Sequence, residues 1–284
     1  MKEVKTICVL GAGTMGGGIA QVAAQSGYEV ILRDVSDEFL VRGMGNIQRS
    51  LERLAKGGQI EAARIEPILS RIRMTTDMAA AASAAQVVIE AAPEKLELKQ
   101  SIFKELDQVC PPETILASNT SGISITSIAS ATQHRGRVIG MHWFNPAPIM
   151  RLIEIIRGLE TTDETVQAVQ DLSTRMGKQT VVVQDSQGFI VTRALTPFLL
   201  ECWRMLEEGI ATKEDIDTAI KLGLNHPMGP FELTDFIGLD VELSVCEDMR
   251  KTYGDKFVPP QHLQHLVNSG HLGRKTGRGF YKYR

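Results

Sequence analysis

The stretch KTICVLGAGTMG, residues 5–16, decides the fold of this chain. Lys5 to Leu10 is a short apolar run rich in β-branched side chains, which is typical of a buried parallel strand. Gly11 permits a tight turn after it, Gly13 has no Cβ to keep a pyrophosphate away from the backbone, and Gly16 lets a helix pack close to the strand. The free N–H groups and positive dipole end of that helix would hold the phosphates. The predicted contacts of this loop with a dinucleotide are Gly11, Gly13, Thr14, Met15 and Gly16.

A second strand and an acid complete the dinucleotide-binding fingerprint. The predicted helix ends at Gly27, and residues 29–32 form a strand that leads to Asp34. Asp34 stands at about the 20-residue offset at which an acid accepts hydrogen bonds from the adenosine ribose. Because its carboxylate would repel a 2′-phosphate, the sequence predicts NAD rather than NADP. The adjacent Arg33 would favour the phosphate, but beside Asp34 we interpret it as a solvated charge.

The composition excludes several classes of protein. Of the 284 residues, 43% are hydrophobic and 23% are charged, as in a globular protein with an ample core. A formal net charge of -3 gives no reason to expect binding to nucleic acid or to an anionic membrane. No apolar run reaches ~18 residues, and the N-terminus enters the first strand without a signal peptide. We expect a cytoplasmic protein, or an organellar one if a transit peptide has been removed.

The cysteines and histidines do not predict a metal site. His262 and His265 are close in sequence, but no cluster of acids or cysteines accompanies them. The four cysteines form no C-x-x-C pair, which argues against both a zinc site and a disulfide framework. We therefore expect no bound metal, and free buried thiols in a reducing compartment. The cysteines are Cys8, Cys110, Cys202 and Cys246.

Strands alternate with helices along the first two thirds of the chain, which predicts an α/β fold with a doubly wound, mostly parallel sheet of the Rossmann type. Helices are expected at 97–109 and 163–176, and a helical hairpin, 37–56 and 60–70, interrupts the alternation. The hairpin carries three bases that either solvate a helix or meet a phosphate-bearing substrate: Arg49, Arg53 and Lys56. The predicted strands are residues 5–10, 29–32, 71–75, 86–91, 114–117, 137–141, 152–156 and 180–183.

The pattern becomes entirely helical after Gly188. We place the domain boundary near residue 186, with an NAD-binding domain over residues 1–186 and a smaller helical domain over 187–284. A helical unit of about 100 residues has a marginal core by itself, so we expect it to dock on the first domain or to pair with a second copy. Its helices are predicted over 189–208, from Thr212 to Leu222, and beginning near Pro230, Leu239 and Pro260.

Polar residues gather at three predicted strand ends, which is where an open parallel sheet binds ligands. The clusters are residues 91–95 with Lys99, residues 118–122 and residues 141–146. His142, in the third cluster, is a candidate general base. Glu154 lies inside the next apolar run, where a carboxylate is costly unless it is paired. We predict that the two form a catalytic pair, although His142 between apolar neighbours also fits a half-buried core histidine.

Longer motifs resemble one protein family over essentially the whole chain. They are residues 11–16, 117–121, 142–146, 185–190, 226–233 and 273–281. On these motifs the chain is similar to the L-3-hydroxyacyl-CoA dehydrogenase family, in the short, single-function bacterial form that is often called 3-hydroxybutyryl-CoA dehydrogenase. The resemblance implies reversible, NAD-dependent oxidation of an L-3-hydroxyacyl-CoA, with a short chain such as 3-hydroxybutyryl-CoA, to the 3-ketoacyl-CoA.

The resemblance also implies roles for individual residues. His142 matches the catalytic base and Glu154 matches its partner. Ser121 matches a serine that binds the substrate near C3, and Asn145 matches the asparagine beside it. Lys56 is expected to meet the CoA phosphates, and the helical domain to bind substrate, to close over it with the first domain and to join two chains as a homodimer. The expected cofactor contacts outside the glycine loop are Asp34, Glu94, Lys99 and Asn119.

Two positions depart from the family pattern. Thr192 stands where the family commonly has an asparagine that contacts the acyl group, and Gly122 stands where many relatives have a second serine. Thr192 keeps a hydroxyl but lacks the reach of the amide, so it affects substrate preference and rate more than reaction type. Two rival functions stay open, oxidation of a free hydroxy acid such as an aldonate and a non-catalytic NAD-binding structural role. The basic hairpin favours CoA, and the presence of His142, Glu154 and Ser121 favours catalysis.

Overall fold

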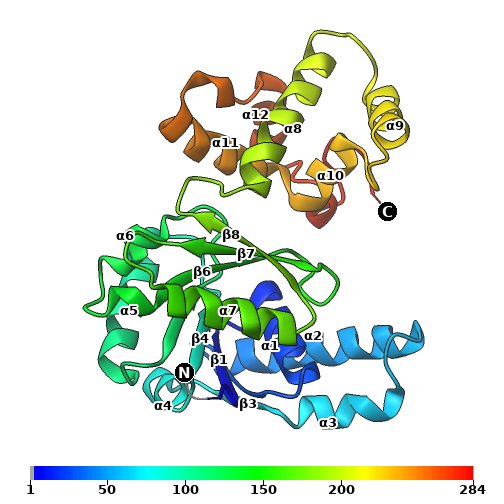
Figure 1. Ribbon diagram of the computed structural model, residues 1–284. Helices are drawn as coiled ribbons and strands as arrows, with labels where there is room; N and C mark the ends of the chain where they lie inside the picture. Colours follow the sequence, from blue (N-terminus) through cyan, green and yellow to red (C-terminus); the bar gives the residue numbers. More distant parts are fainter. Residues whose placement is uncertain (1–2, 284) are drawn as a thin grey trace. The chain divides into compact units, whose positions relative to one another are not determined.

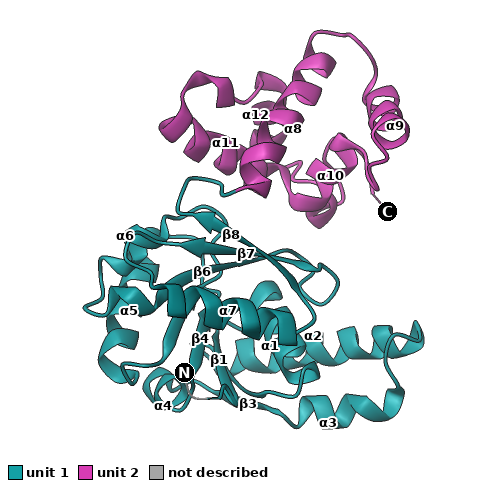
Figure 2. Ribbon diagram, viewed as in Figure 1, with its two compact units in different colours: residues 1–189 teal, residues 190–284 magenta. Residues whose placement is uncertain are grey.

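The computed structural model describes residues 3–283, and the chain divides into two compact units between Phe189 and Ile190 (Figure 2). The boundary expected near residue 186 lies a few residues before this division. Phe189 belongs to the first unit because its side chain is only 2% exposed and packs in the hydrophobic core of that unit.

The first unit is built on an eight-stranded sheet flanked by helices (Figure 1). The strands lie in the order β3-β2-β1-β4-β5-β6-β7-β8, and every neighbouring pair is parallel except β6 and β7. The predicted doubly wound, mostly parallel architecture is therefore confirmed. The strands are β1 (Thr6–Leu10), β2 (Glu29–Arg33), β3 (Ile72–Thr75), β4 (Val87–Glu90), β5 (Ile115–Ser118), β6 (Val138–Trp143), β7 (Leu152–Arg157) and β8 (Gln179–Gln184).

Both faces of the sheet are buried at its centre, as the apolar run of β1 predicts. Ile7 and Val9 point into one hydrophobic core, whereas Cys8 and Leu10 point into another. This alternation arises because successive side chains of a strand point to opposite faces. Helices must therefore cover both sides, which leaves the strand ends as the places where a ligand can reach the sheet.

The helices of the first unit include two, α4 and α6, in stretches for which no helix was predicted. They have 6 and 5 residues, too few to show a helical period in the sequence. The helices are α1 (Thr14–Gln25), α2 (Asp37–Lys56), α3 (Ile65–Leu69), α4 (Met78–Ser83), α5 (Leu96–Val109), α6 (Ile125–Ala129) and α7 (Asp163–Arg175).

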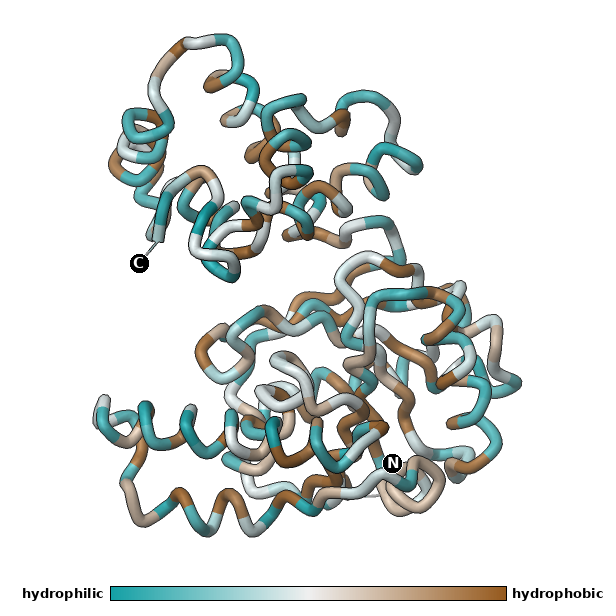
Figure 3. The backbone as a smooth tube through the Cα atoms, turned by 180° about the vertical axis from the view of Figure 1, so that it is seen from behind, coloured by the Kyte–Doolittle hydropathy of each residue, from teal (hydrophilic) through white to brown (hydrophobic). Residues whose placement is uncertain are grey.

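The predicted helical hairpin forms, but its second arm is shorter than expected. The first arm, α2, begins after Ser36, whose side chain accepts a hydrogen bond from the N–H of Phe39. The second arm is a 3-10 turn, Ala62–Arg64, that continues as the short α3, so the helix predicted over 60–70 was wrong in extent. Hydrophilic and hydrophobic residues alternate along both arms (Figure 3). The buried stripe of α2 is Leu40, Gly43, Ile47 and Leu51.

The second unit is helical, as predicted, with its own core around Trp203 and Phe231. The helix expected from residue 189 begins at Val191, because Phe189 has a φ of 51° and cannot continue it. Asp235 is buried, and it accepts hydrogen bonds from the N–H of Phe280, the N–H of Tyr281 and the hydroxyl of Tyr283. The helices are α8 (Val191–Glu207), α9 (Lys213–Gly223), α10 (Pro230–Ile237), α11 (Leu239–Tyr253) and α12 (Gln261–Asn268).

Candidate active site

The glycine loop between β1 and α1 has the geometry of a phosphate-binding turn. Gly11 has a φ of 103°, and a Cβ there would lie 2.7 Å from the carbonyl oxygen of Ala91. A Cβ at Gly16 would overlap the Gly11 carbonyl, so the helix packs against the turn only because this residue is glycine. A Cβ at Gly13, by contrast, would meet no atom within 4 Å. Gly13 therefore faces open space at the point where a pyrophosphate has to approach.

The N-terminus of α1 and Asp34 are held together beside this loop. Gly13 is the N-cap of α1, and among residues 3–283 no side chain caps that end. The carboxylate of Asp34 accepts hydrogen bonds of 2.6 Å from the N–H of Ala12 and of 2.6 Å from the N–H of Val35. The uncapped helix end attracts an anion, and the acid lies at the ends of β1 and β2, as the dinucleotide fingerprint requires. These residues fit NAD.

His142 and Glu154 are direct partners across the antiparallel pair β6–β7. Nδ1 of His142 lies 2.7 Å from Oε2 of Glu154, and the two side chains are nearly or wholly buried. The imidazole ring also packs against Phe144, at 4.5 Å between ring centroids, and against Phe189, at 5.6 Å. The carboxylate and the two rings hold the imidazole in one orientation. Because Nδ1 is engaged by Glu154, Nε2 is the nitrogen available to exchange a proton with a ligand.

The Ser121 loop is tied down by two side chains from neighbouring strand ends. One carboxylate oxygen of Glu94 accepts hydrogen bonds from the N–H of Ser121 at 2.9 Å and of Gly122 at 3.2 Å, and from the hydroxyl of Thr120. The side-chain oxygen of Asn119 accepts a hydrogen bond of 2.9 Å from the N–H of Trp143. Ser121 itself is exposed. Glu94 and Asn119 therefore shape the loop that presents Ser121.

Lys99 lies in a buried charge cluster that sequence reasoning missed. Its ammonium is 2.7 Å from Glu90 Oε1 and 3.4 Å from Glu94 Oε2, and its side chain has no exposed surface. Glu90 is also fully buried, and it accepts hydrogen bonds from the Ser118 hydroxyl at 2.6 Å and the N–H of Ala92 at 2.6 Å. The sequence did contain a signal for this cluster, because Glu90 is an acid at the end of the apolar strand β4 and a buried carboxylate needs a partner. The contact predicted between Lys99 and NAD stays a prediction.

A pocket of about 300 Å³ joins the glycine loop to the helical hairpin and to the loop that follows β6. Arg49 and Arg53 line it from α2, and Asn145 lines it from the β6–β7 loop. Lys56, the predicted CoA contact, is exposed at the end of α2 and does not line this pocket. The lining residues are Gly13, Thr14, Gly17, Gly18, Gln21, Asn46, Ile47, Arg49, Ser50, Arg53, Asn145, Pro146, Ala147 and Pro148.

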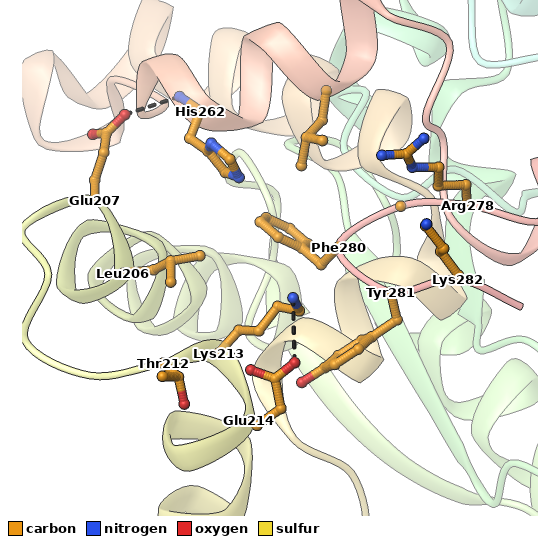
Figure 4. A pocket seen from close by; sticks show the side chains of 12 residues that line it. Leu206, Glu207, Thr212, Lys213, Glu214, His262, Arg278, Phe280, Tyr281 and Lys282 are labelled. Atoms are coloured by element: carbon orange, nitrogen blue, oxygen red, sulfur yellow. Dashed lines mark hydrogen bonds and ion pairs between the residues drawn. The ribbon is translucent and has the colours of Figure 1, made fainter.

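The helical unit has a separate and larger pocket, of about 910 Å³, between α8, α9, α12 and the C-terminal segment (Figure 4). Its wall mixes apolar side chains such as Leu206 and Phe280 with charged ones such as Lys213 and Glu214. No residue of the predicted active site lines it. Thr192, the predicted acyl contact, is half-buried in the first turn of α8, where its carbonyl accepts a hydrogen bond from the hydroxyl of Thr196.

Within residues 3–283, no three His, Cys, Asp or Glu side chains come together in a way that would hold a metal ion. None of the helices seen over the same residues combines the length and the apolar character that crossing a bilayer requires.

Two family models match consecutive parts of the chain. The NAD-binding domain of 3-hydroxyacyl-CoA dehydrogenase matches residues 6–186, and the C-terminal domain of 3-hydroxyacyl-CoA dehydrogenase matches residues 188–283. Similar proteins include one from Deinococcus radiodurans, 48% identical over 97% of this chain and 99% of its own length. Another, from Bacillus subtilis, is 46% identical over 99% of this chain and 98% of its own. Both carry the name probable 3-hydroxybutyryl-CoA dehydrogenase.

Solved structures with the same architecture cover both units. The crystal structure of M. tuberculosis FadB2 superposes with a TM-score of 0.97 at 40% identity, over 100% of both chains. That of (S)-3-hydroxybutyryl-CoA dehydrogenase PaaH1 from Ralstonia eutropha has a TM-score of 0.94 at 44% identity, over 99% of this chain and 100% of its own.

Proposed function

The chain belongs to the 3-hydroxyacyl-CoA dehydrogenase family, and from that premise we propose that it oxidises short-chain L-3-hydroxyacyl-CoA, above all 3-hydroxybutyryl-CoA, with His142 as the base. Members of this family bind NAD and act on 3-hydroxyacyl-CoA, so this chain is an NAD-binding 3-hydroxyacyl-CoA dehydrogenase. The preference for a short acyl chain is supported by the names of its bacterial relatives and of a similar solved structure.

The contact of 2.7 Å between His142 and Glu154 carries the proposed mechanism. Nε2 of His142 accepts the proton of the substrate hydroxyl during oxidation and returns it in the reverse reaction. The buried carboxylate of Glu154 keeps the proton of the neutral ring on Nδ1 and stabilises the imidazolium that forms. NAD, when bound, supplies the acceptor for the hydride from C3.

Ser121 and Asn145 orient the substrate in this scheme. Ser121 is exposed on a loop whose backbone is held by Glu94, so its hydroxyl is available to the reacting oxygen. Asn145 lies two residues past β6, on the loop that follows the catalytic strand. Both residues orient the substrate. They raise the rate because they hold the substrate close to the geometry in which it reacts.

The cofactor contacts of the proposal follow the geometry of the glycine loop. The N-terminus of α1 binds the pyrophosphate, and Asp34 binds the adenosine ribose. Thr14 and Met15 lie in the first turn of α1 and would contact the phosphates there. Glu94, Lys99 and Asn119 complete the site around the nicotinamide end, with Lys99 acting from within its buried cluster.

The basic face of α2 supports a CoA thioester rather than a free acid. Arg49 and Arg53 line the pocket that Asn145 also lines, and Lys56 follows on the same helix. Three cations along one helix complement the phosphates of CoA, whereas a free hydroxy acid offers them one carboxylate. Thr192, which stands where the family commonly has an asparagine, is kept in the proposal as a contact of the acyl group.

We propose a cytoplasmic homodimer joined through the helical unit. That unit carries strongly exposed apolar side chains, among them Leu222 at 81% and Ile210 at 66%. Such side chains gain from burial against a second copy. Its cysteines, like those of the first unit, are buried and free, which suits a reducing compartment.

The test of the proposed function is a rate panel read from NADH absorbance. 3-Hydroxybutyryl-CoA, longer 3-hydroxyacyl-CoA esters and free 3-hydroxybutyrate are compared with NAD and with NADP. We expect kcat/KM to be highest for 3-hydroxybutyryl-CoA with NAD. A higher value for the free acid would overturn the CoA assignment, and a higher value for long-chain esters would overturn the short-chain preference.

A further inference from the structure

Lys178 extends beneath the loop that carries Asn145. It immediately precedes β8, and the register pairs the first residues of β7 and β8. Because β6 and β7 are antiparallel while β7 and β8 are parallel, the end of β6 and the start of β8 lie at the same edge of the sheet. The loop of residues 144–151 that joins β6 to β7 therefore passes close to Lys178.

The ammonium of Lys178 is buried and directed at the main chain of this loop. Nζ donates hydrogen bonds of 2.7 Å to the carbonyl of Ala147 and of 2.7 Å to the carbonyl of Met150, and the residue is 8% exposed. It lies 5.6 Å from the centre of the Trp143 ring. Burial lowers the pKa of this ammonium. A buried cation is costly unless its protons find acceptors, and here two main-chain carbonyls of one loop accept from the ammonium.

Helix α1 holds the same loop from another side. A Cβ added to Gly18 would lie 3.1 Å from Cβ of Ala147 and 3.3 Å from Cδ of Pro148, so the helix and the loop are in close contact. Ala147 is buried between these supports. The side chain of Asn145, in contrast, is exposed and makes no hydrogen bond to any residue of the described range 3–283. The position of the Asn145 side chain is therefore set by the main chain of the 144–151 loop.

We propose that Lys178 is a positioning residue for the dehydrogenase reaction, which holds the 144–151 loop so that Asn145 meets the substrate. This inference rests on the proposed role of Asn145. Lys178 touches neither cofactor nor substrate in this scheme, and it acts through the two carbonyls that it binds. Displacing a substrate-orienting group by about 1 Å can cost 10²-fold in rate, so loss of the clamp affects turnover more than cofactor binding.

The test is a double-mutant cycle between K178M and N145A. K178M keeps an unbranched side chain, shorter by one heavy atom, and has no donor for the two carbonyls. We expect K178M to lower kcat with 3-hydroxybutyryl-CoA by about 10- to 100-fold, with the dissociation constant of NAD unchanged. In the N145A background the same change should lower kcat by less than about twofold, because the residue that Lys178 positions is already absent.

A matched control is S173A, which removes another buried hydrogen bond nearby, from the Ser173 hydroxyl to the carbonyl of Val169. It should lower the melting temperature and leave kcat unchanged. Should K178M fail to fold, K178Q goes through the same cycle with the same two outcomes and a smaller expected loss of kcat, because its neutral, shorter side chain still carries an amide donor. If the loss of kcat in the double mutant equals the product of the losses in K178M and N145A, the role of Lys178 is overturned. The role of Asn145 is not affected by that result. An N145A enzyme with wild-type kcat would overturn the role of Asn145 in the proposed function, and that of Lys178 with it.

Discussion

Nδ1 of His142 lies 2.7 Å from Oε2 of Glu154, although 12 positions separate the two residues in the chain. They are register partners in β6 and β7, the antiparallel pair of an otherwise parallel sheet. Directly opposite residues of an antiparallel pair point to the same face, so the carboxylate meets the ring. Proton transfer in the proposed mechanism depends on this contact.

Replacing the imidazole should abolish most of the hydride transfer. H142Q keeps a polar side chain but removes the group that accepts the hydroxyl proton. We expect kcat to fall at least ~100-fold, the low end for general acid–base catalysis. NAD affinity, measured by fluorescence titration, should be nearly unchanged, because His142 is not among the proposed cofactor contacts. An H142Q enzyme with wild-type turnover would exclude this residue as the base.

Removing the charge of Glu154, the partner of His142, should lower kcat and also change its dependence on pH. E154Q preserves the size of the side chain, and it no longer stabilises an imidazolium or selects one tautomer. We expect kcat to fall on the order of 100-fold or more, with the pH profile of kcat displaced from that of the wild type. E160Q is the control, since Glu160 forms an exposed ion pair with Arg135. Equal rates for E154Q and E160Q would contradict the assigned role.

Cofactor preference should respond to the charge at Asp34. D34N retains an oxygen that can accept from the N–H of Ala12, and it removes the repulsion of a 2′-phosphate. We expect the ratio of kcat/KM for NAD to that for NADP to narrow by about tenfold, the effect of roughly 1.4 kcal/mol. D37N, at the exposed start of α2, should leave the ratio as it is. If D34N has the same ratio of kcat/KM for NAD to that for NADP as the wild type, Asp34 does not bind the adenosine ribose.

The buried Glu242 of α11 should make the stability of the helical unit depend on pH. Burial raises its pKa from 4.5 to about 7. Between these values the folded protein keeps a proton that the unfolded chain has released, so the free energy of unfolding falls as pH rises from 4.5 to about 7. The total loss is at most about 3 kcal/mol.

The measurement is urea unfolding of the wild type, E242Q and E247Q at pH 5 and pH 8. E242Q cannot ionise at this position, so its stability should change less between the two pH values than that of the wild type. E247Q, at an exposed position of the same helix, should behave as the wild type. If all three proteins lose stability equally, the pKa of Glu242 is not raised in the folded state.

Much of the first unit could be predicted because its signals are local. The strand, the glycines and the start of α1 are consecutive, and each has its own physical requirement, such as the φ of 103° at Gly11. Glu154 could be paired with His142 because an acid within an apolar strand needs a partner. The extent of the second hairpin arm was missed, since Gly and polar residues around 57–61 leave the onset of a helix undefined.

The buried polar clusters could not be predicted in the same way. Glu90, Lys99 and Ser118 come from β4, α5 and β5 and meet only where these elements pack. Lys178 is similar, because its ammonium binds carbonyls 28 and 31 positions away. A lysine after a helix is usually a solvated charge, and nothing in its neighbours along the chain distinguishes this one.

The order of residues alone determined the family, the cofactor and the alternation of strands and helices, because glycine turns, apolar periods and the acid after β2 act over short distances along the chain. Only the tertiary structure decided which strands are neighbours, and hence that β6 and β7 run antiparallel and bring a base, its carboxylate and a buried lysine to one edge. Those contacts depend on how whole elements pack, and packing joins residues that have no relation in sequence.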